Sequence, residues 1–140
     1  MSFDPNKKVN LLFACLDWRL HPQIEEYFTK NNQGADLCVT AGSIKGLIDP
    51  QTQNYFLAQI EISKKLHNCQ AIILTMHLDC GAYGGASAFE NKDLEVANAK
   101  NELAKARAIV LQKFPELNIQ TFIIGLEKTD CEWNIMPQVV

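Results

Sequence analysis

Two apolar runs, each followed closely by potential metal ligands, constrain the fold of this chain more than any other feature. Val9 to Ala14 precedes Cys15-Leu16-Asp17-Trp18-Arg19, and Ala71 to Thr75 comes just before His77-Leu78-Asp79-Cys80-Gly81. The second run lacks alternating polar positions, which is typical of a strand covered on both faces. Because helical segments separate the strands, we expect a parallel sheet with right-handed crossovers, whose strands carry these clusters at their carboxyl ends.

The two segments supply side chains that zinc prefers. Zinc binds Cys sulfur and His nitrogen in a tetrahedron, and a site with three protein ligands leaves the fourth position to water or substrate. Cys15, His77 and Cys80 therefore predict a zinc site that is open to chemistry. Either cysteine alone would more often be a core thiol, since free Cys is among the most buried residue types. Their joint spacing with His77 favours metal binding.

The order of these residues resembles that of the β-class carbonic anhydrases, over about residues 9–125. The shared pattern is C-x-D-x-R, an Ala-Gly turn and H-x-x-C-G, represented here by Cys15, Asp17, Arg19, Ala41, Gly42, His77, Cys80 and Gly81. The resemblance implies strand order 2-1-3-4, which places strands one and three side by side. It also implies reversible hydration of carbon dioxide to bicarbonate by zinc-bound hydroxide. A related fold can instead hydrolyse carbonyl sulfide or carbon disulfide.

Asp17 and Arg19 are the candidate catalytic pair. They lie two residues apart, so their side chains would share a face of extended backbone. A bidentate pair of this kind orients a carboxylate and keeps it ionised beside a metal. The alternative is an ordinary surface ion pair, worth about 0–1 kcal/mol. In the family, the corresponding Asp accepts a hydrogen bond from the zinc-bound hydroxide, or becomes a fourth ligand when the site is closed.

A non-catalytic function fits the same residues, with zinc structural or regulatory and Asp17 as a permanent fourth ligand, because structural sites are closed. Gly42 and Gly81 are the candidates for binding a small anion such as bicarbonate, since turns of this kind expose backbone N–H groups. Asp79 is expected to cap backbone N–H groups in its loop. After Gly42, the chain departs from the family by having Ser43 where relatives have Asn or Gly.

Helical and strand patterns alternate along the rest of the chain. We expect an α/β fold in three layers, with a mainly parallel sheet of about four strands and helices on both faces. The remaining predicted segments are a helix from Pro22 that ends at Asn31-Asn32-Gln33-Gly34, a strand over Leu37 to Thr40, a loop over Ser43 to Leu47, a helix from Asp49-Pro50 to Leu66, a helix capped by Asn91 or Asp93 that runs through Phe114, a strand over Ile119 to Ile124, and a tail from Cys131 to Val140.

Composition narrows the class of protein. With 140 residues, 47% hydrophobic and 21% charged, residues 1–140 are expected to form one domain. A net charge of −3 leaves no basic patch, so nucleic acid and anionic membranes are not expected as partners. The expected partners are a small substrate and further copies of the chain, as a homodimer or tetramer, because relatives bury this site near a subunit interface.

Cysteine usage and the apolar segments indicate a cytoplasmic protein. Five cysteines without regular spacing suit a reducing compartment, and Cys38, Cys69 and Cys131 have no motif partner. Lys7-Lys8 and the run after it resemble a secretory signal, but the run is short and Asn10 interrupts it. No segment approaches the roughly 20 apolar residues needed to span a bilayer.

Overall fold

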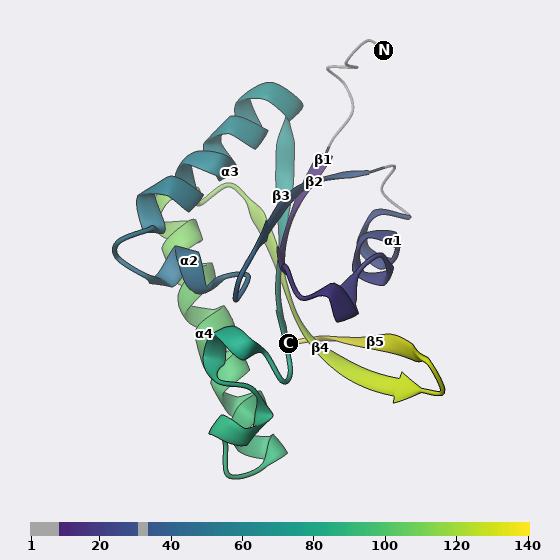
Figure 1. Cartoon of the computed structure of the whole chain (residues 1–140). Helices are drawn as coiled ribbons and strands as arrows, with labels where there is room; N and C mark the ends of the chain where they lie inside the picture. Colours follow the sequence, from purple (N-terminus) through teal and green to yellow (C-terminus); the bar gives the residue numbers. More distant parts are fainter. Residues whose placement is uncertain (1–8, 31–33) are drawn as a thin grey trace.

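The computed structural model describes residues 9–30 and 34–140. Its centre is a five-stranded sheet in the order β2-β1-β3-β4-β5 (Figure 1). The strands are β1 (Val9–Cys15), β2 (Ala35–Thr40), β3 (Cys69–His77), β4 (Asn118–Thr129) and β5 (Glu132–Val139). β1 pairs in parallel with β2 and β3, and β3 pairs in parallel with β4, whereas β5 is antiparallel to β4. The predicted α/β fold and the order 2-1-3-4 are therefore confirmed.

The fifth strand corrects the expectation of about four. It forms from the segment that was predicted as a tail, after a tight turn in which Asp130 has φ +52°. Asp tolerates this left-handed conformation because its short side chain can bond to nearby backbone. Pro137 within the segment argues against a central strand, but an edge strand accommodates proline because one side of it donates no ladder hydrogen bonds. β5 is such an edge.

Helices cover both faces of the sheet. They are α1 (Gln23–Thr29), α2 (Lys45–Ile48), α3 (Gln53–His67) and α4 (Lys92–Lys113). α1 packs on one face, while α2, α3 and α4 pack on the other (Figure 1). Consecutive residues of a strand point to opposite faces. Leu12 and Ile73 thus lie in the core beneath α1, and Phe13, Ile72 and Leu74 lie in the core beneath the other three helices.

Several helix boundaries differ from those predicted. The Asp49 carboxylate accepts a hydrogen bond from the Gln51 N–H at 2.9 Å, which forms a turn and delays the start of α3 to Gln53. The predicted loop from Ser43 to Leu47 overlaps the short helix α2. Asn91, one of the two predicted caps, accepts a hydrogen bond from the Leu94 N–H at 3.0 Å and begins α4.

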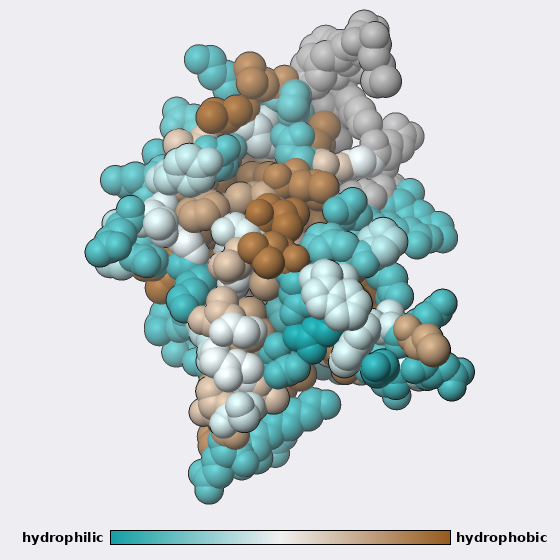
Figure 2. Space-filling model, in the orientation of Figure 1, coloured by the Kyte–Doolittle hydropathy of each residue, from teal (hydrophilic) through white to brown (hydrophobic). Residues whose placement is uncertain are grey.

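Two earlier expectations fall partly outside the described residues. The predicted helix end at 31–34 and the lysine pair at 7–8 include positions that the structure does not describe. Within the described ranges, no helix has both the length and the apolar character needed to cross a membrane. The edge strand β2 exposes apolar side chains. Leu37 and Val39 on this strand are 44% and 41% exposed, and Figure 2 shows hydrophobic side chains gathered in the middle of the face along which β2 runs.

Candidate metal centre

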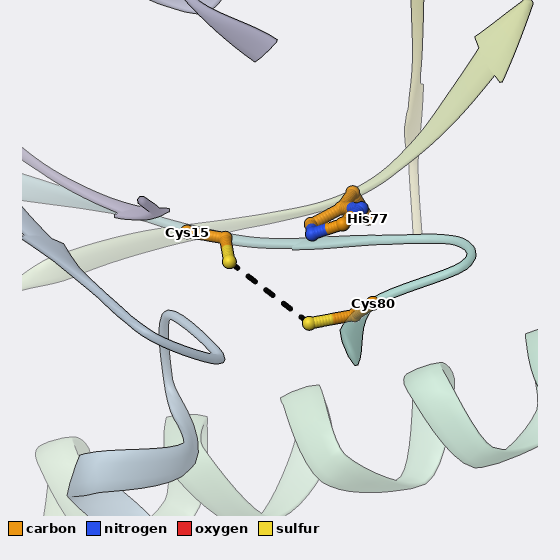
Figure 3. A group of neighbouring side chains, drawn as sticks. All are labelled: Cys15, His77 and Cys80. Atoms are coloured by element: carbon orange, nitrogen blue, oxygen red, sulfur yellow. Dashed lines mark hydrogen bonds between the residues drawn. The ribbon is translucent and has the colours of Figure 1, made fainter. Parts of the chain in front are cut away.

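The centre lies at the carboxyl ends of two adjacent strands. Cys15 is the last residue of β1, His77 is the last residue of β3, and Cys80 follows in the turn after β3 (Figure 3). All three are buried, and their potential ligand atoms lie within 4.8 Å of one another. The two sulfur atoms are 3.9 Å apart. Two thiolates bound to tetrahedral zinc at about 2.3 Å each would be roughly 3.8 Å apart, so the donor set fits this metal.

A hydrogen bond selects the nitrogen of His77 that is free for a metal. The Nδ1 atom lies 2.8 Å from the backbone carbonyl of Leu78, which only accepts, so Nδ1 carries the proton. The Nε2 atom is buried and has no hydrogen-bond partner within the described part of the chain. An unpartnered buried nitrogen is costly in a protein interior. Metal-binding histidines are oriented by a bond of this kind from the other ring nitrogen.

The two thiols form a hydrogen-bonded pair whose pKa values are shifted in opposite directions. The hydrogen bond with Cys80 lowers the pKa of Cys15 to about 4 despite its burial, with help from His77 and the backbone N–H groups of Asp17 and Gly42. The same hydrogen bond to Cys15 raises the pKa of Cys80, and burial adds to this effect. A divalent cation bound between the two sulfur atoms would hold both groups as thiolates, the form that binds metal.

Asp17 borders this cluster without joining it. Its Oδ2 atom lies 3.7 Å from His77 Nε2, yet the three-residue ligand group does not include Asp17. Arg19 holds the carboxylate through its backbone N–H at 2.9 Å from Oδ1 and through Nη2 at 2.7 Å from Oδ2. These bonds keep the pKa of Asp17 below its usual range. The carboxylate is thus ionised and directed beside the ligand cluster.

Asp79 contacts both Ala86 and Arg19, and sequence reasoning predicted only the first of these contacts. Its Oδ1 atom accepts a hydrogen bond from the Ala86 N–H at 2.8 Å, so the predicted loop cap is confirmed. Its Oδ2 atom also accepts from Arg19 Nη1 at 2.8 Å, and its carbonyl accepts from Arg19 Nη2 at 2.9 Å. No local pattern signals the second contact, because the two residues are 60 positions apart.

A cleft of about 830 Å³ reaches Cys15, the one candidate ligand that lines it, and brings the remaining candidate residues to one place. Gly42 and Gly81 both line this cleft, together with Asp17 and Arg19. The residues that complete its lining are Cys15, Leu16, Trp18, Ala41, Asp79, Ala82, Gly84 and Gly85. Its walls therefore combine small apolar side chains with a charged pair, which suits a small substrate.

The loop after Gly42 is fastened to the turn after Cys80. Gly42 has φ +76°, and a side chain there would crowd Lys45 and Ala82. Lys45 Nζ donates a hydrogen bond to the carbonyl of Ala82 at 2.6 Å and lies 5.1 Å from the centre of the Tyr83 ring. The two turns that support the thiolates are thus linked by one lysine. Sequence reasoning missed this link.

Fold and site together define a class of α/β proteins with a Cys-His-Cys centre at the ends of the first and third strands. Residues 5–131 match the family model described as “Putative carbonic anhydrase”, and the chain belongs to this family. An uncharacterized protein of Rickettsia conorii is 31% identical over 130 residues, which is 87% of this chain and 70% of the relative.

Solved structures show the same fold at low identity. A β-carbonic anhydrase from Trichomonas vaginalis has a TM-score of 0.62 and 14% identity, covering 99% of this chain and 88% of its own. A tetrameric β-carbonic anhydrase from Sordaria macrospora has a TM-score of 0.60 and 15% identity, covering 85% of this chain and 76% of its own. The chain is therefore a member of the putative carbonic anhydrase family that has the fold of the β-carbonic anhydrases.

Proposed function

We propose that this protein is a zinc-dependent carbonic anhydrase that interconverts carbon dioxide and bicarbonate. The observation that carries the proposal is the buried Nε2 atom of His77, which has no hydrogen-bond partner among the described residues and lies beside two buried thiols 3.9 Å apart. Cys15, His77 and Cys80 would hold the metal. When bound, zinc acts as a Lewis acid that brings the pKa of water close to neutrality.

The surrounding residues would orient the reactants. Asp17 accepts a hydrogen bond from the attacking water, since Arg19 keeps the carboxylate ionised and aimed. Ala41 and Ala82 offer an apolar wall to the linear, uncharged carbon dioxide. Backbone groups at Gly42 and Gly81 are the proposed contacts for the bicarbonate anion in the same cleft.

Metal analysis with matched variants tests the ligand set. We expect one zinc per chain in the wild type, and its loss in Cys15→Ser and Cys80→Ser, because the hydroxyl of serine is a poor zinc ligand. Cys38→Ser is the control, since burial raises the pKa of that thiol to about 11 and it lies outside the ligand group. Zinc retained in both ligand variants would contradict the assignment.

Turnover measurements test the substrate. The same preparation would be assayed for hydration of carbon dioxide across pH 6–9, and for hydrolysis of carbonyl sulfide and carbon disulfide. We expect hydration to be the fast reaction. Preference for a sulfur substrate would replace the proposed reaction on the same site. Absence of all three activities in zinc-loaded protein would favour a structural metal with Asp17 as its fourth ligand.

We also propose that the chain folds as one domain, works in the cytoplasm and forms a homodimer or tetramer. All five cysteines are free, as suits a reducing compartment. Leu16 and Trp18 beside the cleft are 58% and 74% exposed, and Leu37 and Val39 on β2 are also exposed. Apolar groups gathered in this way are typical of a surface that another chain covers.

A further inference from the structure

Arg19 is held from more directions than its pairing with Asp17 requires. Its guanidinium donates to the Asp17 carboxylate, to the Asp79 carboxylate and to the Asp79 carbonyl. The ring of Trp133 lies 5.2 Å from its central carbon. Only 15% of the Arg19 side chain is exposed. The structure thus surrounds one cation with two carboxylates, a carbonyl and an aromatic ring.

We propose that Asp79 and Trp133 are positioning residues that fix Arg19, and through it keep Asp17 off the metal. This inference rests on the proposed metal site. Asp17 Oδ2 is only 3.7 Å from His77 Nε2, so a small rotation would bring the carboxylate to the fourth coordination position. A flexible arginine bound to Asp17 alone could move together with it. An arginine that is also bound to other residues cannot move together with Asp17 in this way.

Asp79 is itself a rigid anchor. It has φ +58°, and its Oδ1 atom is occupied by the Ala86 N–H. Its own N–H donates to the carboxylate of Glu95, a buried residue on α4. Because these three restraints come from the backbone turn, the following loop and a long helix, they limit the movement of the carboxylate that faces Arg19, although 51% of the Asp79 side chain is exposed.

Trp133 connects the fifth strand, β5, to the site through its contact with Arg19. It lies on β5, and η1 (Trp18–Leu20), the short 3₁₀ helix that carries Arg19, packs against this strand. Lys128 on β4 also lies 5.8 Å from the centre of the Trp133 ring. An aromatic ring beside a guanidinium attracts it electrostatically and restricts its rotation. Arg19 is therefore held between the turn after β3 and the β4–β5 hairpin.

Azide binding to protein loaded with Co²⁺ tests the inference without measuring turnover. Azide needs the open coordination position, and its binding changes the visible spectrum of cobalt. Asp79→Asn keeps an oxygen for the Ala86 N–H but removes the charge that faces Arg19. We expect this variant to bind cobalt normally and azide about tenfold or more weakly, the scale typical of lost outer-shell partners.

Trp133→Leu should act in the same direction, and Trp133→Phe, which keeps a ring, should stay within about threefold of the wild type. Asp49→Asn is the control, because Asp49 also caps a loop N–H and lies outside the cleft.

A double-mutant cycle shows whether Asp79 acts through Asp17. In an Asp17→Asn background no carboxylate remains at position 17 to compete for the metal, so adding Asp79→Asn should leave azide affinity unchanged. Equal weakening with and without the Asp17 carboxylate would overturn the inference, as would wild-type azide affinity in both Asp79→Asn and Trp133→Leu. A wild type that binds no cobalt would overturn the proposed function as well.

Discussion

A single hydrogen bond decides which nitrogen of His77 faces the thiols. Its Nδ1–H group donates a hydrogen bond to the backbone carbonyl of the next residue, Leu78. No separate carboxylate is therefore needed to select the tautomer. The motif H-x-x-C-G predicted the proximity of His77 and Cys80, because the two ligands are close in sequence and the turn between them is short. It could not predict the tautomer, which depends on how the chain leaves β3.

The contacts of Arg19 show where sequence reasoning stops. Its pairing with Asp17 followed from their spacing of two residues, and the structure contains it. Its contacts with Asp79 and Trp133 join separate elements, and they depend on the turn after β3 and on a strand that was not predicted. Such contacts require the tertiary structure, since neither residue carries a local signal for them.

At this scale, Arg19→Ala should damage catalysis more than metal content. Without its partner, Asp17 can turn toward the metal and close the site. We expect near-normal zinc and a loss of about 10–100-fold in hydration rate, as for other outer-shell removals. Zinc analysis and stopped-flow hydration assays would be run on the variant and on Arg107→Ala, whose guanidinium binds the Ile119 carbonyl away from the cleft. An unchanged rate in Arg19→Ala would mean that the Asp17–Arg19 pair is only structural.

Among the elements, those covered on both faces were predicted best. β1 and β3 are almost wholly buried, so their sequences are apolar whichever face a residue points to. β5 was missed because it is an exposed edge with mixed polarity and a proline. α2 was missed because four residues are too few to show helical periodicity, and only packing against its neighbours defines it.

The packing of α2 against α3 predicts a steric effect at Gly46. A methyl group at this position would overlap the ring of Phe56 on α3. Overpacking of this kind costs about 1–3 kcal/mol, so Gly46→Ala should lower the free energy of unfolding by that amount. Urea denaturation would measure the change. Gly81→Ala is the comparison, because a methyl group there meets no atom within 4 Å. Equal stability of Gly46→Ala and wild type would show that Phe56 can move aside.

For the whole molecule, the exposed apolar residues predict self-association. Light scattering at micromolar concentration should give the mass of a dimer or tetramer. Val39→Lys on the edge strand β2 should shift the distribution toward the monomer, because it places a charge in the proposed contact. Leu94→Lys on α4 is a control of similar exposure, at 48% against 41% for Val39. A monomeric wild type would contradict the proposed assembly.

The opposite pKa shifts of Cys15 and Cys80 also determine how many protons metal binding should release. At pH 7 the Cys15 thiol, whose pKa is lowered to about 4, is already ionised, whereas Cys80, whose pKa is raised, keeps its proton. Uptake of a divalent metal should then liberate about one proton per chain, whereas two independent thiols with ordinary pKa values near 8.5 would liberate about two. Calorimetric titration with Zn²⁺ in buffers of different ionisation enthalpy counts these protons. The release of about one proton, rather than two, when the metal binds is therefore the expected consequence of two sulfur atoms held 3.9 Å apart.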